Sequence, residues 1–152
     1  KQNNRWIGQF DRNNQNYFIG SGSGQLTTGG AANVAIGDST LAKSINTVAN
    51  VAIGNNALKE NTSGFLNTAI GNAALRNNLT GLSNVAIGAG SLISHKTGND
   101  NIGIGLNTIS TDTTGSNNIA IGSAAMQTST NANAYLAIGS SALSLAKNGN
   151  NK

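Results

Sequence analysis

The sequence predicts an all-β protein, a β-solenoid in which each coil of the chain takes 17 residues. The dipeptide Ile-Gly recurs every 17 residues without insertion or deletion, and its glycines are Gly20, Gly37, Gly54, Gly71, Gly88, Gly105, Gly122 and Gly139. The residues before each glycine alternate as in Val-Ala-Ile, which is typical of a pleated strand. Glycine and asparagine interrupt the chain every few residues, so apolar positions keep helical spacing for only one turn. A strict repeat of this size indicates stacked units that cover one another.

Each repeat is predicted to contain a short strand that ends at its Ile-Gly dipeptide. In this strand the Val and Ile positions point to one face and the Ala position to the other. We expect the Val/Ile face to form the core, with one inward column of isoleucines: Ile19, Ile36, Ile53, Ile70, Ile87, Ile104, Ile121 and Ile138. A solvated opposite face would carry Lys, Glu, Thr and Ser rather than recurrent Ala. We therefore expect the Ala face to be a second buried surface with little room.

The remaining residues of each repeat are predicted to form corners and a second extended segment. Asparagine stands four residues before the Ile-Gly glycine at Asn16, Asn33, Asn50, Asn67, Asn84, Asn101 and Asn118. Asparagine tolerates turn conformations, and stacked asparagines hydrogen-bond along the stack as a ladder. Leu, Ile or Met stands four residues after most of the glycines, and a second glycine often stands ten residues after. Eight coils at the strand spacing of roughly 4.8 Å give a rod roughly 40 Å long.

The strand motif resembles a known family. Asn-Val-Ala-Ile-Gly at residues 33–37, 50–54 and 84–88 is similar to the head repeat of YadA-like trimeric autotransporter adhesins. Asn-Thr-Ala-Ile-Gly at residues 67–71 and Asn-Ile-Ala-Ile-Gly at residues 118–122 are close variants. The resemblance covers most of the chain, and its repetition in phase makes it specific.

This resemblance implies a left-handed parallel β-roll and a homotrimer of three rolls packed side by side. The Val and Ile columns would fill each roll, and the small Ala column would line the trimer interface at Ala35, Ala52, Ala69, Ala86, Ala120 and Ala137. Members of the family are bacterial surface adhesins, and similar repeats occur in phage tail fibres. The 17-residue form with Asn-Thr-x-Gly, here at residues 61–64, is similar to repeats of fibres that end in a self-cleaving chaperone domain.

The repeats extend over residues 16–152 as one domain, and residues 1–15 are predicted to form an N-terminal cap or junction. Ile7-Gly8 precedes the next Ile-Gly by 12 residues, so a shortened first coil is one interpretation. Four of the six aromatic residues gather near this end, at Trp6, Phe10, Tyr17 and Phe18. They are interpreted as a cover for the open end of the solenoid, and the alternative is a sugar-binding platform.

The composition sets further limits on the class of protein. Charged residues make up 9% of the chain, aromatic residues make up 4%, and there is no cysteine or proline. The absence of cysteine excludes disulfides and thiol chemistry, and the absence of proline suits long hydrogen-bonded ladders. No apolar run is long enough to span a bilayer. The chain opens on Lys1, and we interpret it as a fragment of a longer fibre whose outer-membrane anchor lies in other segments.

Residues that are able to perform catalysis are few and scattered. His95 is the single histidine, in a column of polar turn residues, and is expected to be an exposed turn residue. A Ser-His-Asp arrangement would need His95, Asp100 and a serine to converge, which nothing in the repeat indicates. The carboxylates fall in different columns and form no acid/base pair. We therefore expect no enzyme activity, no cofactor and no bound metal.

Two groups of residues are candidates for partner binding or for the interface between chains. Lys59 and Arg76 share a column on adjacent coils, with Lys43 one position away, and form a short basic stripe. Such a stripe attracts polyanions, but solubility is the preferred interpretation. Val48, Phe65 and Leu82 share another column and predict an apolar patch, which lines either the trimer interface or an adhesive surface.

Together these observations predict a non-enzymatic, trimeric segment of a bacterial surface fibre. Its expected partners are two further copies of the chain and a host surface protein, matrix protein or surface glycan, which the fibre binds in adhesion. Nucleic acid and direct membrane insertion are not expected. The alternative is the shaft or receptor-binding segment of a phage tail fibre, located on the virion.

Overall fold

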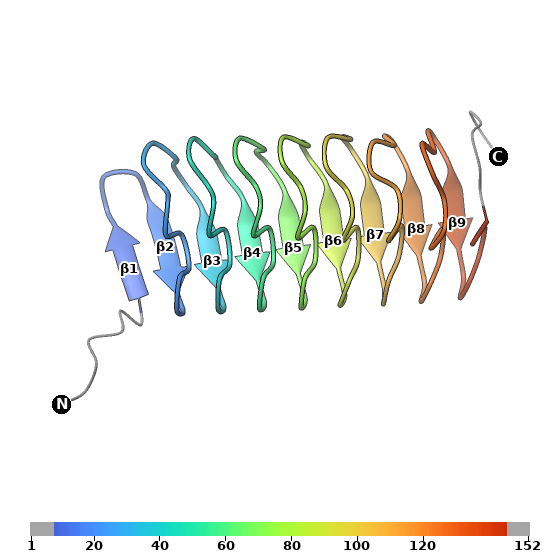
Figure 1. Cartoon of the computed structure of the whole chain (residues 1–152), viewed down its shortest axis with the longest axis horizontal. Helices are drawn as coiled ribbons and strands as arrows, with labels where there is room; N and C mark the ends of the chain where they lie inside the picture. The colour runs from blue at the N-terminus through green and yellow to red at the C-terminus, as the bar shows by residue number, and fades with distance from the viewer. Residues whose placement is uncertain (1–7, 146–152) are drawn as a thin grey trace.

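The computed structural model describes residues 8–145, and this part of the chain consists of β-strands, turns and bends (Figure 1). Within it, nine strands form one sheet in sequence order. Their bounds are β1 (Gly8–Asp11), β2 (Asn16–Ile19), β3 (Val34–Ile36), β4 (Val51–Ile53), β5 (Thr68–Ile70), β6 (Val85–Ile87), β7 (Ile102–Ile104), β8 (Ile119–Ile121) and β9 (Leu136–Ile138). The predicted strands before each Ile-Gly glycine are thus confirmed.

Strands β2 to β9 are parallel neighbours that follow one another by one coil of the chain. The register pairs each residue with the residue 17 positions later, as in Val34 with Val51 and Ala35 with Ala52. Backbone groups bond to both neighbouring coils, as in Val34 N to Asn50 O at 2.9 Å and Gly37 N to Ile19 O at 2.8 Å. The predicted β-solenoid with a 17-residue coil is therefore confirmed, and it makes about 7 turns.

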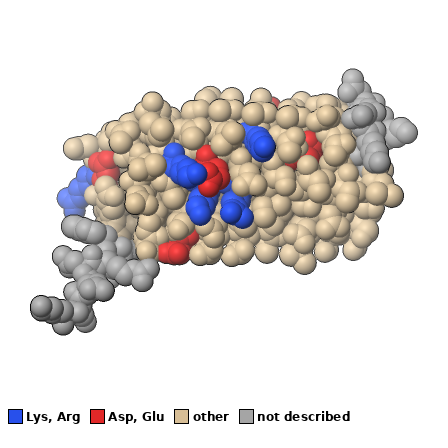
Figure 2. Space-filling view, viewed as in Figure 1, with Lys and Arg blue, Asp and Glu red and all other residues tan. Residues whose placement is uncertain are grey.

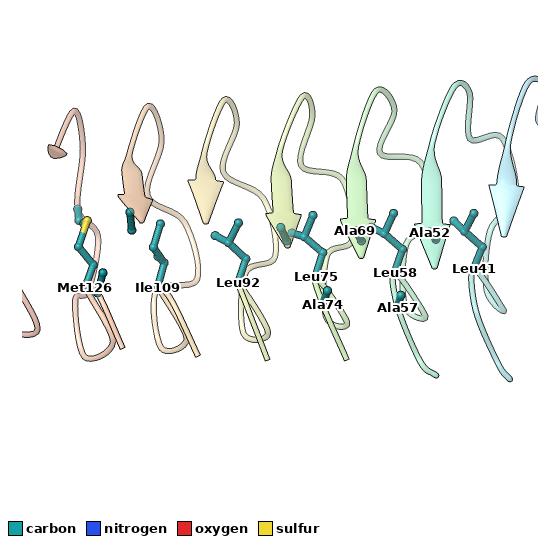
Figure 3. Close-up of a cluster of buried hydrophobic side chains, with 14 of the residues drawn as sticks. Leu41, Ala52, Ala57, Leu58, Ala69, Ala74, Leu75, Leu92, Ile109 and Met126 are labelled. Atoms are coloured by element: carbon teal, nitrogen blue, oxygen red, sulfur yellow. The ribbon is translucent and has the colours of Figure 1, made fainter. Parts of the chain in front are cut away.

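The prediction of which strand face is the core was wrong. The Ala positions of the strands point into the coil and have almost no exposed surface, whereas the isoleucines point outward, with 38% of Ile36 and 36% of Ile87 exposed. The physical reason is the small space that a 17-residue coil encloses. A column of fully buried large residues already fills it: Leu41, Leu58, Leu75, Leu92, Ile109 and Met126 (Figure 3). The strand opposite this column has room only for small side chains.

The predicted asparagine ladder is confirmed inside the coil. Asn33 donates to Asn16 Oδ1 from its backbone N at 3.0 Å and from Nδ2 at 3.1 Å. Nδ2 of Asn33 also donates to Thr47 O at 2.7 Å. The same pattern repeats from coil to coil up to Asn118, whose Oδ1 accepts from Tyr135 N at 3.1 Å. The ladder joins adjacent coils and ties the start of each strand to the turn that leads into the next strand.

The Ile-Gly glycines form corners that no other residue can occupy without strain. Gly54 has a φ of 130°, and a Cβ atom there would lie 2.6 Å from the carbonyl carbon of Gly71 on the next coil. Both the backbone conformation and the close approach of coils require glycine at this position. This requirement explains why the glycine of the dipeptide recurs in every coil.

The N-terminal end of the sheet is covered by a hairpin rather than by a shortened coil. β1 pairs with β2 in antiparallel orientation, so the interpretation of Ile7-Gly8 as a coil was wrong for the part that the structure describes. Phe10 on β1 and Tyr17 on β2 form an edge-to-face pair with ring centroids 6.0 Å apart. Trp6 and Ile7 lie outside the described residues. An antiparallel strand at this position covers the open edge of the parallel sheet.

Candidate interaction surface

The outward face of strands β2 to β9 is apolar along its whole length. Two side chains per strand point outward, and of these positions only Thr68 holds a residue that is neither aliphatic nor aromatic. The positions are at least partly exposed in every strand, because no other part of the described chain covers them. We call these residues the Val/Ile face: Tyr17, Ile19, Val34, Ile36, Val51, Ile53, Thr68, Ile70, Val85, Ile87, Ile102, Ile104, Ile119, Ile121, Leu136 and Ile138.

The size of the Val/Ile face distinguishes it from an ordinary protein surface. Eight strands at a spacing of roughly 4.8 Å give a continuous apolar surface about 38 Å long. Soluble monomers rarely expose contiguous apolar patches beyond a few hundred square ångströms, and larger ones mark sites of contact. Sequence reasoning missed this surface because it placed the larger residues inside. The sequence contained a signal for this outward surface, because the side chains in the column that begins with Tyr17 differ in size, as Thr68 and Leu136 show.

The residues that were predicted to line the trimer interface lie inside the coil. Ala35, Ala52, Ala69, Ala86 and Ala120 have 0% exposed surface and Ala137 has 2%. A side chain without exposed surface in the single chain offers no area to a second chain. The assignment of the Ala column to the interface is therefore corrected, and the Val/Ile face takes its place as the candidate contact surface.

The structure brings Val48, Phe65 and Leu82 together in one column on successive coils. Leu66 N donates to Val48 O at 3.0 Å and Ser83 N donates to Phe65 O at 3.1 Å, which places the three residues side by side. Val48 is 44% exposed, Phe65 is 42% exposed and Leu82 is half-buried. We call these three residues the lateral patch.

Polar residues continue the column of the lateral patch in the following coils. Leu82 N donates to Asn99 Oδ1 at 2.9 Å, and Asn99 N donates to Ser116 Oγ at 3.1 Å. The lateral patch is thus local, and it covers three coils, whereas the Val/Ile face extends through all of the strands β2 to β9.

The basic residues lie beside an acidic one. Lys43 forms an ion pair with Glu60, which lies in the same column one coil further along, next to Lys59. Figure 2 shows Lys and Arg side chains around an acidic side chain near the middle of one face, while other acidic side chains lie apart from this group. Residues 8–145 contain five basic and five acidic side chains, and the net charge of +4 arises from residues 1–7 and 146–152. Lys59 and Arg76 therefore belong to a mixed cluster rather than to a purely basic stripe.

His95 is buried, so the prediction of an exposed turn residue was wrong. Its column faces the interior, where Ser44, Asn61, Asn78, Asp112 and Ser129 are also buried. Nε2 of His95 lies 3.0 Å from Nδ2 of Asn101, and Nδ1 lies 3.4 Å from the carbonyl oxygen of Asp112. Burial lowers the pKa of His95, although the Asp112 charge and carbonyl groups of Gly98 and Asp112 act in the opposite direction. Neutral imidazole is thus the form that fits this site.

Asp112 is a buried carboxylate that backbone donors satisfy. Its Oδ1 accepts from Thr114 N at 3.1 Å and Gly115 N at 2.8 Å, and its Oδ2 accepts from Ala132 N at 2.8 Å. These bonds hold a turn closed and join it to the next coil, which is a structural role. Within residues 8–145 no three His, Asp or Glu side chains lie close enough together to hold a metal ion.

Comparison with family models, curated proteins and solved structures finds no match for this chain. In residues 8–145 no helix has the length and apolar character that a membrane span requires.

Proposed function

We propose that this chain is a non-enzymatic segment of a trimeric extracellular fibre, in which three rods pack in register through their Val/Ile faces. The observation that supports the proposal is the continuous apolar surface on the outside of strands β2 to β9. The proposal keeps the left-handed winding, the trimer and the bacterial surface location that the resemblance to YadA-like head repeats implies. It moves the contact between chains from the Ala column to the Val/Ile face.

A second copy of the chain suits this face better than an unrelated globular partner. Two copies have the same spacing between coils, so apolar side chains meet apolar side chains along the entire rod. Removing apolar surface from water contributes about 25 cal/mol per square ångström, which offsets the entropy lost on association. An unrelated partner would need apolar side chains at the same spacing over the same length.

We further propose that the fibre mediates adhesion to host cells, matrix proteins or surface glycans. The lateral patch supports this role because it is local, and a contact between identical periodic rods does not require a local patch. The second candidate is a shaft or receptor-binding segment of a phage tail fibre. The 17-residue coil favours it, with the Asn61–Gly64 turn closed by a bond of 3.0 Å from Gly64 N to Asn61 Oδ1.

Sedimentation equilibrium of the wild-type chain and of a variant with Ile70→Lys and Ile87→Lys tests the trimer. The wild type is expected to sediment at three times the chain mass of 15.3 kDa, and the variant as a folded monomer. A control variant with Thr80→Lys and Thr97→Lys adds the same charges at exposed positions on adjacent coils and should remain trimeric. A monomeric wild type, or a trimer of the Ile70/Ile87 variant, would contradict the proposed contact.

The adhesive role has its own test. Wild-type trimer and a Phe65→Ser variant are applied to immobilised matrix proteins, host cells and bacterial cells. Binding to host material that weakens in the variant supports adhesion, and binding to bacterial cells supports the phage fibre. Equal binding of wild type and variant to every surface would refute the role of the lateral patch.

A further inference from the structure

The Val/Ile face differs between its two ends. At the N-terminal end, Tyr17 on β2 is 49% exposed and Phe10 on β1 is 63% exposed. The two residues are directly paired in the register of β1 and β2, so their side chains lie on the same side of the sheet. Phe10 therefore extends the Val/Ile face by one strand (Figure 1). At the C-terminal end, the face consists of the aliphatic residues Leu136 and Ile138.

Thr68 is the one residue of the Val/Ile face that is neither aliphatic nor aromatic. It lies on β5, is half-buried, and is paired in the register with Val51 on β4 and Val85 on β6. The next outward residue on its own strand is Ile70. The side chains around Thr68 on this face therefore offer its hydroxyl no hydrogen-bonding group. β5 is the fourth of the eight strands β2 to β9, so Thr68 lies away from the midpoint of the face.

A parallel arrangement of chains with aligned ends brings each of these residues to the level of its own copies. The Phe10 and Tyr17 rings of the chains then lie together at one end of the contact, and aromatic rings pack favourably against one another. The Thr68 hydroxyls lie at a single level, where they hydrogen-bond to one another directly or through a shared water. This arrangement leaves no hydroxyl of the face without a partner.

Other arrangements place the same residues opposite aliphatic ones. If one chain ran antiparallel with its ends aligned, β5 would lie opposite β6, and Thr68 would face Val85. β2 would lie opposite β9, so Tyr17 would face Leu136 instead of another aromatic ring. A parallel chain that is shifted by one coil would also place Thr68 at the level of a valine. A hydroxyl enclosed in an apolar contact without a partner loses the hydrogen bond that water supplies to it in the free chain.

We infer that Phe10, Tyr17 and Thr68 determine the orientation of the chains, so that the rods of the assembly run parallel and in register. The inference rests on the proposed contact through the Val/Ile face, and it names the residues that make this contact specific. A single polar residue within the apolar contact of a coiled coil sets the register in the same way. The remaining Val and Ile positions alternate so regularly that they present nearly the same surface in either direction.

Fluorescence energy transfer between chains measures their orientation. Thr28 and Thr130 are exposed and occupy the same column six coils apart, about 29 Å along the rod. Since the chain has no cysteine, Thr28→Cys and Thr130→Cys each accept one dye. Chains labelled with donor and chains labelled with acceptor are unfolded, mixed and refolded. In a parallel assembly, transfer between chains labelled at the same position should exceed transfer between chains labelled at different positions.

A variant with Phe10→Val, Tyr17→Val and Thr68→Val tests the role of the three residues. Valine already occupies the column of Tyr17 and Thr68 in other strands, so the variant should fold and form trimers. It is expected to lose most of the excess transfer between chains labelled at the same position. A control variant with Leu79→Val and Thr97→Val changes exposed residues outside the strands and should keep the full excess.

The possible results separate the orientation from the assembly itself. A monomeric wild type gives no transfer in any mixture and contradicts the proposed contact. A wild-type trimer with equal transfer in all mixtures, or with greater transfer between Thr28 and Thr130, overturns the inferred orientation alone. A three-residue variant that keeps the full excess overturns the role of these residues, and so does one that sediments as a folded monomer, because they would then hold the chains together without orienting them.

Discussion

Phe18 and Gly24 fill the first coil with a large residue on the strand and a small one opposite it, which is the reverse of the arrangement in the coils that follow. In the coil that begins at Ala35, a small strand residue faces the large Leu41, and both are fully buried. In the first coil the large residue is Phe18 on the strand, and position 24 is glycine, where a Cβ atom would lie 2.6 Å from Phe18 Cγ. The interior thus keeps its total side-chain volume, although the two contributions are reversed.

This exchange predicts strong coupling between the two positions. Gly24→Leu alone should destabilise the chain by about 1–3 kcal/mol through overpacking, and Phe18→Ala alone by about 3–5 kcal/mol through a cavity. The double variant recreates the pair of the other coils and should recover most of the loss. Leucine has a positive φ of about 50° at Leu41 and Leu75, so the backbone at position 24 accepts it. Urea denaturation of the four chains measures the coupling, and additive losses would contradict the packing described here.

The asparagine ladder predicts that a buried Asn contributes far more to stability than an exposed one. Asn67→Ala removes the acceptor of Asn84 N at 3.0 Å and the donor to Gly81 O at 2.8 Å. Each buried group that loses its partner costs about 1–3 kcal/mol, so a loss of about 2–5 kcal/mol is expected. The control is Asn72→Ala, where the side chain is exposed. Thermal unfolding of both variants provides the comparison, and similar midpoints would argue against the ladder.

Replacing glycine with alanine is expected to destabilise the chain by different amounts at two positions with positive φ. Gly54→Ala introduces a Cβ atom 2.6 Å from the carbonyl carbon of Gly71 and should destabilise the chain by about 3 kcal/mol or more. At Gly22 the φ is 68°, and the nearest atoms to an added Cβ are 3.7 Å away. Gly22→Ala should therefore cost only about 1 kcal/mol, the penalty of the left-handed conformation itself. Comparable losses in the two variants would show that contact between coils is not the cause.

The periodic features of the fold were predictable from the sequence. Which face of each strand points into the coil was not. The Ile-Gly period gives the coil length and the strand positions, and the recurring Asn gives the ladder. Alternation in Val-Ala-Ile distinguishes two faces but does not say which of them is inside. The decision rests on volume, because the Leu75 column already occupies the interior and leaves room for Ala69 but not for Ile70.

The position of His95 shows a second limit of sequence reasoning. Polar residues in its column indicated an exposed turn, although buried polar residues are common where a ladder satisfies them. Asn61 and Asn78 are joined by a hydrogen bond between coils, which becomes visible only when the coils are stacked. The lateral patch was predictable because it required only the register between coils.

The most direct test of the proposed assembly compares crosslinking at neighbouring positions that point in opposite directions. The chain has no cysteine, so Ala86→Cys and Ile87→Cys each introduce a single thiol. Treatment with a short bismaleimide followed by denaturing electrophoresis should show covalent dimers for Ile87→Cys and none for Ala86→Cys. Crosslinks at position 86, or none at position 87, would contradict contact between chains through the Val/Ile face.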